Sequence, residues 1–262
     1  MAGLAGLTGP AAAQEAAEPV AFEADYSAYY LGLKLMETGV EAEFGPKTYG
    51  VRSMYKTGGL LAWAKKDQIR SMVRGRTDGE ALKPDYFEHR DILEHGRTVQ
   101  MAFTPEDIEV TATPPYSSFG DPPATQADRQ GSLDLVSGIM QTAMNVGDDP
   151  DWPCGPDVPI FNGKERYNLR MAHAGAEEAD LDAYEGPVIA CHVYYMPLAG
   201  FDADDVPKEK YLNTPITVWF TDRPGDDFHV PIRFSYPVGI ATLVIEAKSL
   251  TLGPVPSEHA ER

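Results

Sequence analysis

Ile160-Phe161-Asn162-Gly163-Lys164-Glu165-Arg166-Tyr167 is the stretch that decides the fold. An Asn-Gly pair between two apolar runs is the strongest short-range signal for a β-hairpin, because both residues accept the positive φ angles of a two-residue turn. We therefore expect a strand at 158–161 to pair with a strand at 165–172. The stretch predicts antiparallel β-structure in this part of the chain.

The only two cysteines of the 262-residue chain, Cys154 and Cys191, lie on either side of this hairpin. Such a pair can be two buried thiols, part of a metal site or one disulfide, and the redox compartment decides between them. Residues 1–13 are uncharged, rich in Ala, Gly and Leu, and end in three alanines, which resembles the end of a secretory signal peptide and its cleavage site. Export predicts a Cys154–Cys191 disulfide, which would stabilise the fold by about 3–4 kcal/mol.

The chain divides into three segments. Residues 1–19 are expected to be a signal-peptide remnant followed by a flexible lead, although the basic residues that usually open such a signal are absent and an unstructured tail is the alternative. Residues 20–252 are expected to form a single β-rich domain. The polar segment 253–262 is expected to be a disordered tail.

Alternating polar and apolar residues recur along the domain, with turn residues between the runs. Besides the central hairpin, the runs lie at 22–31, 33–44, 48–55, 68–74, 84–90, 97–103, 107–113, 187–196, 216–220, 230–236 and 240–250. Strands at such regular spacing predict a sandwich, a barrel or an open curved sheet, and they argue against a parallel α/β fold.

Residues 132–144 carry the clearest helical pattern. Ser132 is the expected N-cap, and Asp134 is expected in the first turn, where the helix dipole favours a carboxylate. A single amphipathic helix among strands must bury its apolar face on a sheet. We therefore expect a mainly β fold, in which a large curved antiparallel sheet, an open barrel or β-spiral, holds this helix in its concave side.

The candidate binding residues are apolar side chains on and near this helix. The proline-rich segment 113–131 before it is expected to be a loop, either a mobile lid or an extended cross-over. The apolar run 60–63 is too short to assign by its periodicity, and a helical turn laid across the sheet is one form that it could take. Methionine adapts well to irregular apolar ligands, although plain core packing is the alternative role. The candidates are Trp63, Leu133, Val136, Ile139, Met140 and Met144.

Composition restricts the partners. The formal net charge is -18, from 40 acidic and 22 basic side chains, and the basic residues are scattered. This charge argues against nucleic acid, which needs clustered Lys and Arg. No run approaches 18 apolar residues, so no transmembrane segment is expected. The acidic turn at 148–151 lacks the spacing of an EF-hand, and the six histidines lack ligand spacing, so neither a metal nor a cofactor is expected.

Sequence motifs of catalysis are also missing. The chain has no nucleophile elbow, no P-loop and no dinucleotide-binding fingerprint, so no catalytic residue is assigned. A triad can still assemble across a fold, because its members are defined by geometry. Such a hydrolase would use Ser132 or Ser137 as the nucleophile and His192 as the base.

Five stretches, in this order, resemble an exported bacterial family known as domain of unknown function 3108 (DUF3108). They are 49–56, 82–87, 132–137, 161–167 and 231–234. The family's usual Phe-Asp-Gly is Phe161-Asn162-Gly163 in this chain, a change that keeps the turn chemistry. The resemblance implies a periplasmic protein of many antiparallel strands and no established enzyme activity. At the level of the fold, the chain is similar to the Lol lipoprotein carriers and to periplasmic β-spiral proteins.

The sequence therefore predicts a non-enzymatic, periplasmic cell-envelope protein that binds an apolar ligand, a lipoprotein or a partner peptide. The expected partners are a lipid, a lipoprotein or another envelope protein. The alternatives are an envelope hydrolase and a structural scaffold of an envelope complex. The space between the helix and the sheet distinguishes them, because a large apolar cavity indicates binding, a polar one with histidine indicates catalysis, and none indicates a scaffold.

Overall fold

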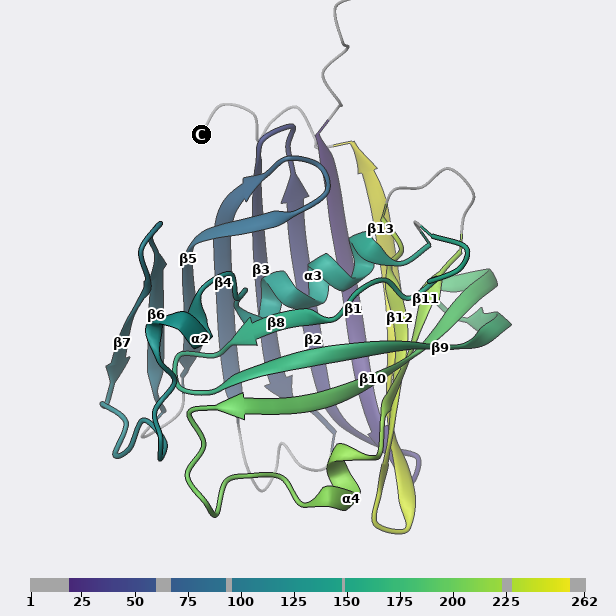
Figure 1. The fold of residues 1–262 in the computed structure, drawn as a ribbon. Coiled ribbons are helices and arrows are strands. Elements are labelled where there is room, and N and C mark those ends of the chain that lie inside the picture. The colour runs from purple at the N-terminus through teal and green to yellow at the C-terminus, as the bar shows by residue number, and fades with distance from the viewer. Residues whose placement is uncertain (1–18, 60–66, 93–95, 148, 223–227, 255–262) are drawn as a thin grey trace, which may run out of the picture.

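The computed structural model describes residues 19–59, 67–92, 96–147, 149–222 and 228–254. Three expectations concern segments outside these ranges: the signal-peptide segment up to residue 18, the helical turn with Trp63, and the end of the tail from residue 255. The rest of the chain forms one antiparallel sheet with a long helix against it (Figure 1).

The described residues form 13 strands in a single sheet, and every pair of neighbours is antiparallel. The strands are β1 (Val20–Tyr30), β2 (Leu33–Phe44), β3 (Thr48–Thr57), β4 (Gln68–Thr77), β5 (Leu82–Asp91), β6 (Thr98–Phe103), β7 (Ile108–Thr113), β8 (Val158–Phe161), β9 (Arg166–Leu181), β10 (Tyr184–Ala199), β11 (Ile216–Thr221), β12 (Pro231–Val238) and β13 (Ala241–Pro254). The described helices are α2 (Gln126–Arg129), α3 (Leu135–Asn145) and α4 (Glu209–Leu212).

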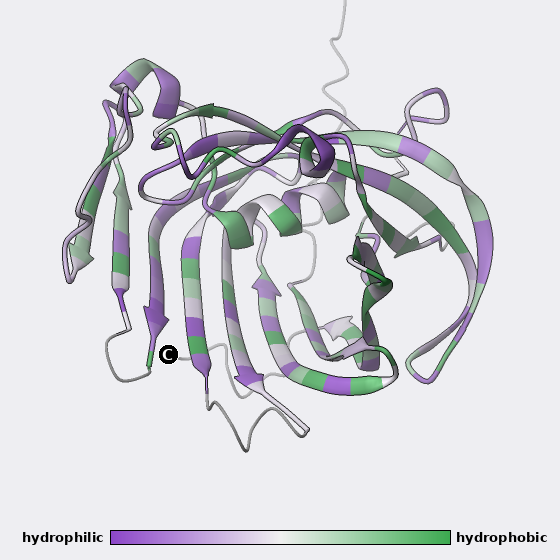
Figure 2. Ribbon diagram, turned by 90° about the horizontal axis from the view of Figure 1, so that it is seen from below, coloured by the Kyte–Doolittle hydropathy of each residue, from purple (hydrophilic) through white to green (hydrophobic). Residues whose placement is uncertain are grey.

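The sheet is organised around β1, which pairs with β2 on one side and with β13 on the other. From β1, one arm of the sheet runs through β2 to β7, and the other runs through β13 and β12 back to β8. The two arms curve toward each other without closing, and α3 lies in the hollow between them (Figure 2). The predicted fold class, a large curved antiparallel sheet with a helix in its concave side, is confirmed.

Alternation along the strands explains which face is buried. In β1, Phe22, Ala24 and Tyr26 are buried, while Glu23 and Asp25 between them are exposed. The strand register continues this inner face across the first arm as a row of buried side chains. The row consists of Phe22, Ala42, Val51, Val73, Phe87 and Met101.

The proline-rich segment 114–131 joins the two edges of the sheet. Arg129 of α2 donates two hydrogen bonds to the carboxylate of Asp107, of 3.1 and 2.6 Å, beside the start of edge strand β7. The same guanidinium lies 5.8 Å from the ring centre of Phe161 on edge strand β8. Of the two roles considered for this segment, the structure therefore shows the cross-over.

Three local predictions need correction. The N-cap of α3 is Asp134 and not Ser132, because Leu133 is held in a bridge to Ile160 and the helix begins only after it. The single-turn helix α2 lies in the segment 113–131, which was expected to be a loop. The strand expected at 165–172 continues to Leu181, because β10 pairs with it along its whole length.

Candidate functional site

Helix α3 is held in the hollow by polar contacts to the first arm of the sheet. The Tyr49 hydroxyl on β3 lies 2.7 Å from the Ser137 hydroxyl. The backbone N–H of Leu82, at the start of β5, donates a 2.7 Å hydrogen bond to the Gln141 side chain. Buried polar groups of this kind need partners, and these two fix the position of the helix along the sheet.

The other side of α3 packs on β8. A Cβ atom placed on Gly138 would lie 2.1 Å from Cδ1 of Ile160, a side chain that is fully buried. Only glycine allows the helix backbone to approach the strand this closely. Tethers on the first arm and close packing on the second arm therefore hold α3 from both sides.

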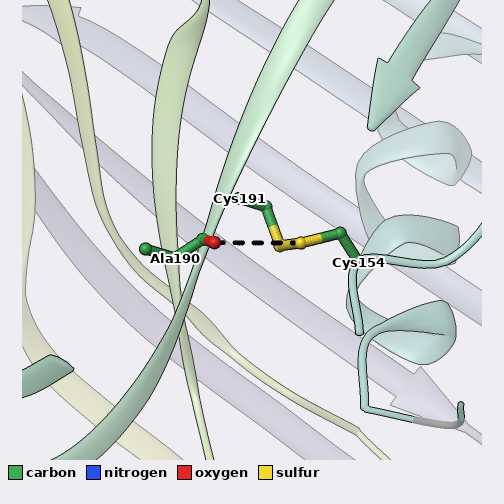
Figure 3. Close-up of a disulfide and its surroundings, with 3 residues drawn as sticks. All are labelled: Cys154, Ala190 and Cys191. Carbon is green, nitrogen blue, oxygen red and sulfur yellow. Dashed lines mark hydrogen bonds between the residues drawn. A yellow bond between two sulfur atoms is a disulfide. The ribbon is translucent and has the colours of Figure 1, made fainter. Parts of the chain in front are cut away.

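The predicted disulfide between Cys154 and Cys191 is confirmed, with Cα atoms 5.9 Å apart. Figure 3 shows the bridge running from the loop after α3 to β10, with Cys154 Sγ 3.8 Å from the Ala190 carbonyl oxygen. Both cysteines are fully buried. The bridge anchors the C-terminal side of the helix to the second arm of the sheet.

A cavity of about 390 Å³ lies between α3 and the sheet. Its volume falls in the range of small-molecule sites in proteins. Side chains from α3 and from strands of both arms line it: Phe22, Tyr26, Thr38, Val40, Leu135, Ile139, Met140, Thr142, Leu169, Val193, Ile216, Val218, Phe220, Pro231, Phe234 and Ile245.

The lining offers few free polar groups. Among these residues only Tyr26, Thr38 and Thr142 carry polar side-chain atoms. The Tyr26 hydroxyl donates to the Pro231 carbonyl at 2.8 Å, and the Thr142 hydroxyl donates to the Ile139 carbonyl at 2.7 Å. Because both hydroxyl protons are already used within the protein, a ligand would meet an almost wholly apolar surface.

The cavity has a buried end and an exposed end. Phe22, Met140 and Phe220 are buried and mark the inner end. Leu135, at the start of α3, is 42% exposed, and Ile216, at the start of β11, is 40% exposed. We call the opening beside Leu135 and Ile216 the mouth of the cavity.

The candidate binding residues divide between several places. Ile139 and Met140 line the cavity, as the helical pattern suggests. Val136 packs into the main core, Leu133 bridges to β8, and Met144 lines a separate surface pocket beside Trp152. Trp63 lies outside the described residues.

The sequence-based reasoning missed Leu135 and the strand residues of the cavity. Leu135 lies outside the stripe formed by the helix candidates Leu133, Val136, Ile139, Met140 and Met144. The strand residues carry a weaker signal, namely the inward positions of alternating strands such as Phe22 and Tyr26. Nothing in that alternation indicates which inward positions surround a space.

A buried chain of three polar side chains lies at the first turn of α3. Asp134 accepts hydrogen bonds from the Ser137 backbone N–H at 2.9 Å and from the Ser137 hydroxyl at 2.5 Å. Tyr49 extends the chain to the sheet. Burial raises the pKa of Asp134 to about 6, even though its hydrogen bonds with Ser137 favour the ionised form. The pKa of Tyr49 is also raised, chiefly by burial.

This arrangement does not assemble the triad considered above. Ser137 contacts a carboxylate and a tyrosine, and Ser132 has a buried hydroxyl without a partner in the described part of the chain. His192 follows Cys191 on β10, and Cys191 points toward α3, so alternation places His192 on the outer face. The three residues therefore do not come together at one site.

Another serine and histidine do meet on the inner face of the sheet. The Ser71 hydroxyl lies 3.0 Å from Nδ1 of His89, and burial lowers the pKa of this histidine. These two residues link neighbouring strands β4 and β5, where they pair directly. Among the described residues, no group of three or more His, Cys, Asp or Glu side chains could hold a metal ion.

Comparison with known families gives a clear assignment. A family model described as a protein of unknown function, DUF3108, matches residues 25–248, which is most of the chain. The chain belongs to the DUF3108 family. None of the curated proteins compared with the chain matches it.

Two solved structures resemble this DUF3108 protein. One is a β-barrel-like protein of domain of unknown function DUF1849 from Brucella abortus, with a TM-score of 0.52 and 8% identity, covering 91% of this chain and 98% of the other. This likeness supports the fold alone. The other is described as a "putative lipoprotein" from Parabacteroides distasonis, with a TM-score of 0.31 and 12% identity, covering 90% and 96% of the two chains. No helix in the described part of the chain is long and apolar enough to cross a membrane.

Proposed function

We propose that this DUF3108 protein is a periplasmic cell-envelope protein that binds an acyl chain in the cavity beneath α3, without catalysing a reaction on it. The main support for this proposal is the cavity itself. It has a volume of about 390 Å³, its walls are apolar, and it is open at the mouth beside Leu135 and Ile216. A free lipid and the acyl group of a lipoprotein both present this chemistry.

The chemistry of the walls favours an apolar ligand over a polar one. A polar ligand would lose its hydrogen bonds to water and find almost no replacements, because the Tyr26 and Thr142 hydroxyl groups already donate to backbone carbonyls. An acyl chain loses only contact with water, and each buried methylene contributes about 0.8 kcal/mol. Met140 adds an adaptable side chain to the wall.

An oxidising compartment is supported by the disulfide. Structural disulfides persist in secreted and periplasmic proteins and are rare in the reducing cytosol. The Cys154–Cys191 bridge is fully buried and joins two separate parts of the fold, as a structural bridge does. The bridge supports export to the cell envelope. There, a protein that binds acyl chains has lipids available as ligands in the membranes on both sides of the periplasm.

Native mass spectrometry of protein purified from the periplasm tests the proposal. We expect a bound species with the mass of a fatty acid, a phospholipid or an acylated peptide, and that mass separates free lipid from lipoprotein as the source. The delipidated protein should bind the fluorescent fatty acid cis-parinaric acid with one-site saturation. Failure to retain any lipid, together with no saturable probe binding, would contradict the proposal.

Two variants on α3 serve as a matched pair for this measurement. Ile139→Phe adds a ring that narrows the cavity, so we expect at least a tenfold loss in affinity for the probe. Met144→Phe places a ring on the same helix outside the cavity, and we expect affinity to stay within twofold of wild type. Equal losses in both variants would show that the helix, and not the cavity, determines binding.

The hydrolase alternative has a direct test of its own. The Ser137 hydroxyl is bound to Asp134 and Tyr49, and no histidine takes part in that chain. We therefore expect no labelling of the folded protein by a fluorophosphonate, which reacts with activated serines. Stoichiometric labelling that disappears in Ser71→Ala would instead identify the Ser71–His89 pair as a hydrolytic site.

A further inference from the structure

Two hairpin turns project side by side from the same end of the sheet. The turn between β1 and β2 contains Leu31, and the turn between β12 and β13 contains Ile240. Strand β1 pairs with β13, with Tyr30 opposite Leu243. The Tyr30 hydroxyl also donates a 2.9 Å hydrogen bond to the Val238 carbonyl, which fixes the two hairpins to each other. Figure 1 shows both turns at the lower end of the molecule.

These turns carry large aliphatic side chains in open solvent. Leu31 is 62% exposed and Ile240 is 92% exposed, and their neighbours Leu33 and Val238 are exposed as well. Scattered exposed leucines are ordinary in soluble proteins, but a contiguous apolar group on two linked turns indicates an interaction surface. We call these four residues the tip patch.

Leu31 is in a backbone conformation that leucine rarely adopts. Its φ angle is 52°, followed by Gly32 at 76°, so both central residues of the turn have positive φ. Turns of this type favour Asn, Asp or Gly at the first position, because a branched side chain crowds its own backbone there. A leucine in this place is unfavourable for folding and for solubility alike. Its presence points to a function at the tip.

The ends of the hairpins near the turns also lack charge, in a protein whose formal net charge is -18. Residues 27–33 and 234–245 contain no charged side chain. Three half-buried tyrosines, Tyr29, Tyr30 and Tyr236, stand behind the tip patch. Along β1 and β12, the aliphatic tip is followed by tyrosine and then by a charged residue, such as Arg233 on β12. Proteins show this order across a membrane interface.

The tip patch lies at the same end of the sheet as the mouth of the cavity. Ile245, five residues from Ile240 along β13, lines the cavity. Ile216 stands at the mouth, and its neighbour Thr217 pairs with Ser235 of β12, three residues before Val238. Strands β12 and β13 therefore run from the tip patch to the wall of the cavity.

From these observations we propose that the protein docks on the surface of a lipid bilayer by inserting the tip patch, which places the mouth of the cavity against the lipid. The proposal rests on the proposed function in one respect, namely that docking allows an acyl chain to move between the bilayer and the cavity. The bilayer surface recognised is uncharged, because among the residues that the structure describes no cluster of Lys or Arg surrounds the tip patch. Lys34 and Lys56 both form ion pairs with the single carboxylate of Glu37.

Vesicle flotation of the full chain tests the docking. We expect wild-type protein to float with phosphatidylcholine vesicles and to float less with vesicles rich in phosphatidylglycerol, whose charge repels a protein of net charge -18. The variant Leu31→Asn with Ile240→Asn should lose at least tenfold in vesicle association. Asparagine at position 31 accepts the positive φ angle, so this variant should melt no lower than wild type, and misfolding cannot account for the loss.

Met54→Gln is the matched control, because Met54 is an exposed apolar residue on the outer face of β3, away from the tip patch. It should float like wild type. Equal flotation of the tip variant and wild type would overturn the proposal. A wild-type dimer that becomes a monomer in the tip variant, measured by light scattering without vesicles, would also overturn it and identify a second copy of the chain as the occupant.

Two readouts separate this proposal from the proposed function. The tip variant should bind cis-parinaric acid in solution as well as wild type, yet transfer it to vesicles at least tenfold more slowly. Probe binding without vesicle association in the wild type would reject docking and leave the cavity function standing. Vesicle association without probe binding would reject the cavity function and leave docking standing.

Discussion

The hydroxyl groups of Tyr49 and Ser137 lie 2.7 Å apart and connect β3 to the first turn of α3. Ser137 also donates to Asp134, so its own proton is used and Tyr49 donates to Ser137 when Asp134 is ionised. One sheet tyrosine thus determines where the helix begins relative to the first arm. The cavity lies on the next face of the same helix, and its width depends on this contact.

Tyr49→Phe removes this hydrogen bond and leaves the ring in place. Because Ser137 keeps its contact with Asp134, we expect a loss of about 1 kcal/mol in the free energy of unfolding, measured with urea. Tyr211→Phe, an exposed tyrosine on α4, is the control and should change stability by less than about 0.5 kcal/mol. If both variants match wild type, the Tyr49–Ser137 contact does not hold the helix.

Asp134 should make stability depend on pH. Its pKa is raised from 3.8 to about 6 in the folded protein, so between these values the folded state binds more protons than the unfolded state. The stabilisation is complete below about pH 4 and is lost as the pH rises through 6. The pKa shift corresponds to about 3 kcal/mol.

Asp134→Asn isolates this contribution, because asparagine stays neutral and can still accept from the Ser137 backbone N–H. We expect the stability of wild type relative to this variant to fall by about 3 kcal/mol between pH 4 and pH 7, measured by urea unfolding at each pH. Other carboxylates cancel in that difference. A difference that stays constant would show that folding leaves the pKa of Asp134 unchanged, and one that grows with pH would show that folding lowers this pKa.

Much of the sheet could be predicted from the sequence, because alternation is a local signal and this sheet buries one face. Phe22, Ala24 and Tyr26 show the signal plainly, and the turn at Asn162-Gly163 has its own chemistry. The extension of β9 to Leu181 could not be predicted this way, since its polar second half is a strand only because β10 pairs with it. The predicted start of α3 was wrong for a similar reason. Serine is a favourable N-cap residue, but Leu133, which follows Ser132, is held in a bridge to Ile160, so the helix begins only after it.

The sequence could predict the apolar chemistry of the candidate site but not the full set of residues that line it. The helix stripe pointed to Ile139 and Met140, which do line the cavity. The other walls come from strands that are distant in sequence. Whether their side chains fill the space or leave it open depends on how closely α3 approaches the sheet. Gly138 and the Tyr49–Ser137 contact determine that distance. The capping box formed by Thr125 and Asp128 is the local sequence signal for α2.

Reduction of the disulfide should destabilise the protein strongly. Cys154 and Cys191 are 37 residues apart, and closing a loop of this length in the unfolded chain contributes about 4 kcal/mol. The midpoint of urea unfolding should fall on addition of a reductant in the wild type. The double variant Cys154→Ala with Cys191→Ala should start near the reduced midpoint and not respond to the reductant. A reductant effect that persists in the double variant would contradict this origin.

Leu135 should control access to the cavity more than it controls folding. It is 42% exposed at the mouth, and leucine side chains in such places contribute little to the core. Leu135→Gln puts an amide where an acyl chain would enter, and the amide must lose water when the ligand covers it. We expect the affinity for cis-parinaric acid to fall about fivefold to tenfold, while the thermal midpoint stays within a few degrees of wild type. Leu198→Gln, also exposed but not part of the cavity lining, is the control and should bind the probe like wild type. If Leu135→Gln binds normally while Ile139→Phe does not, ligands reach the cavity by another route, and the mouth must lie elsewhere along the helix.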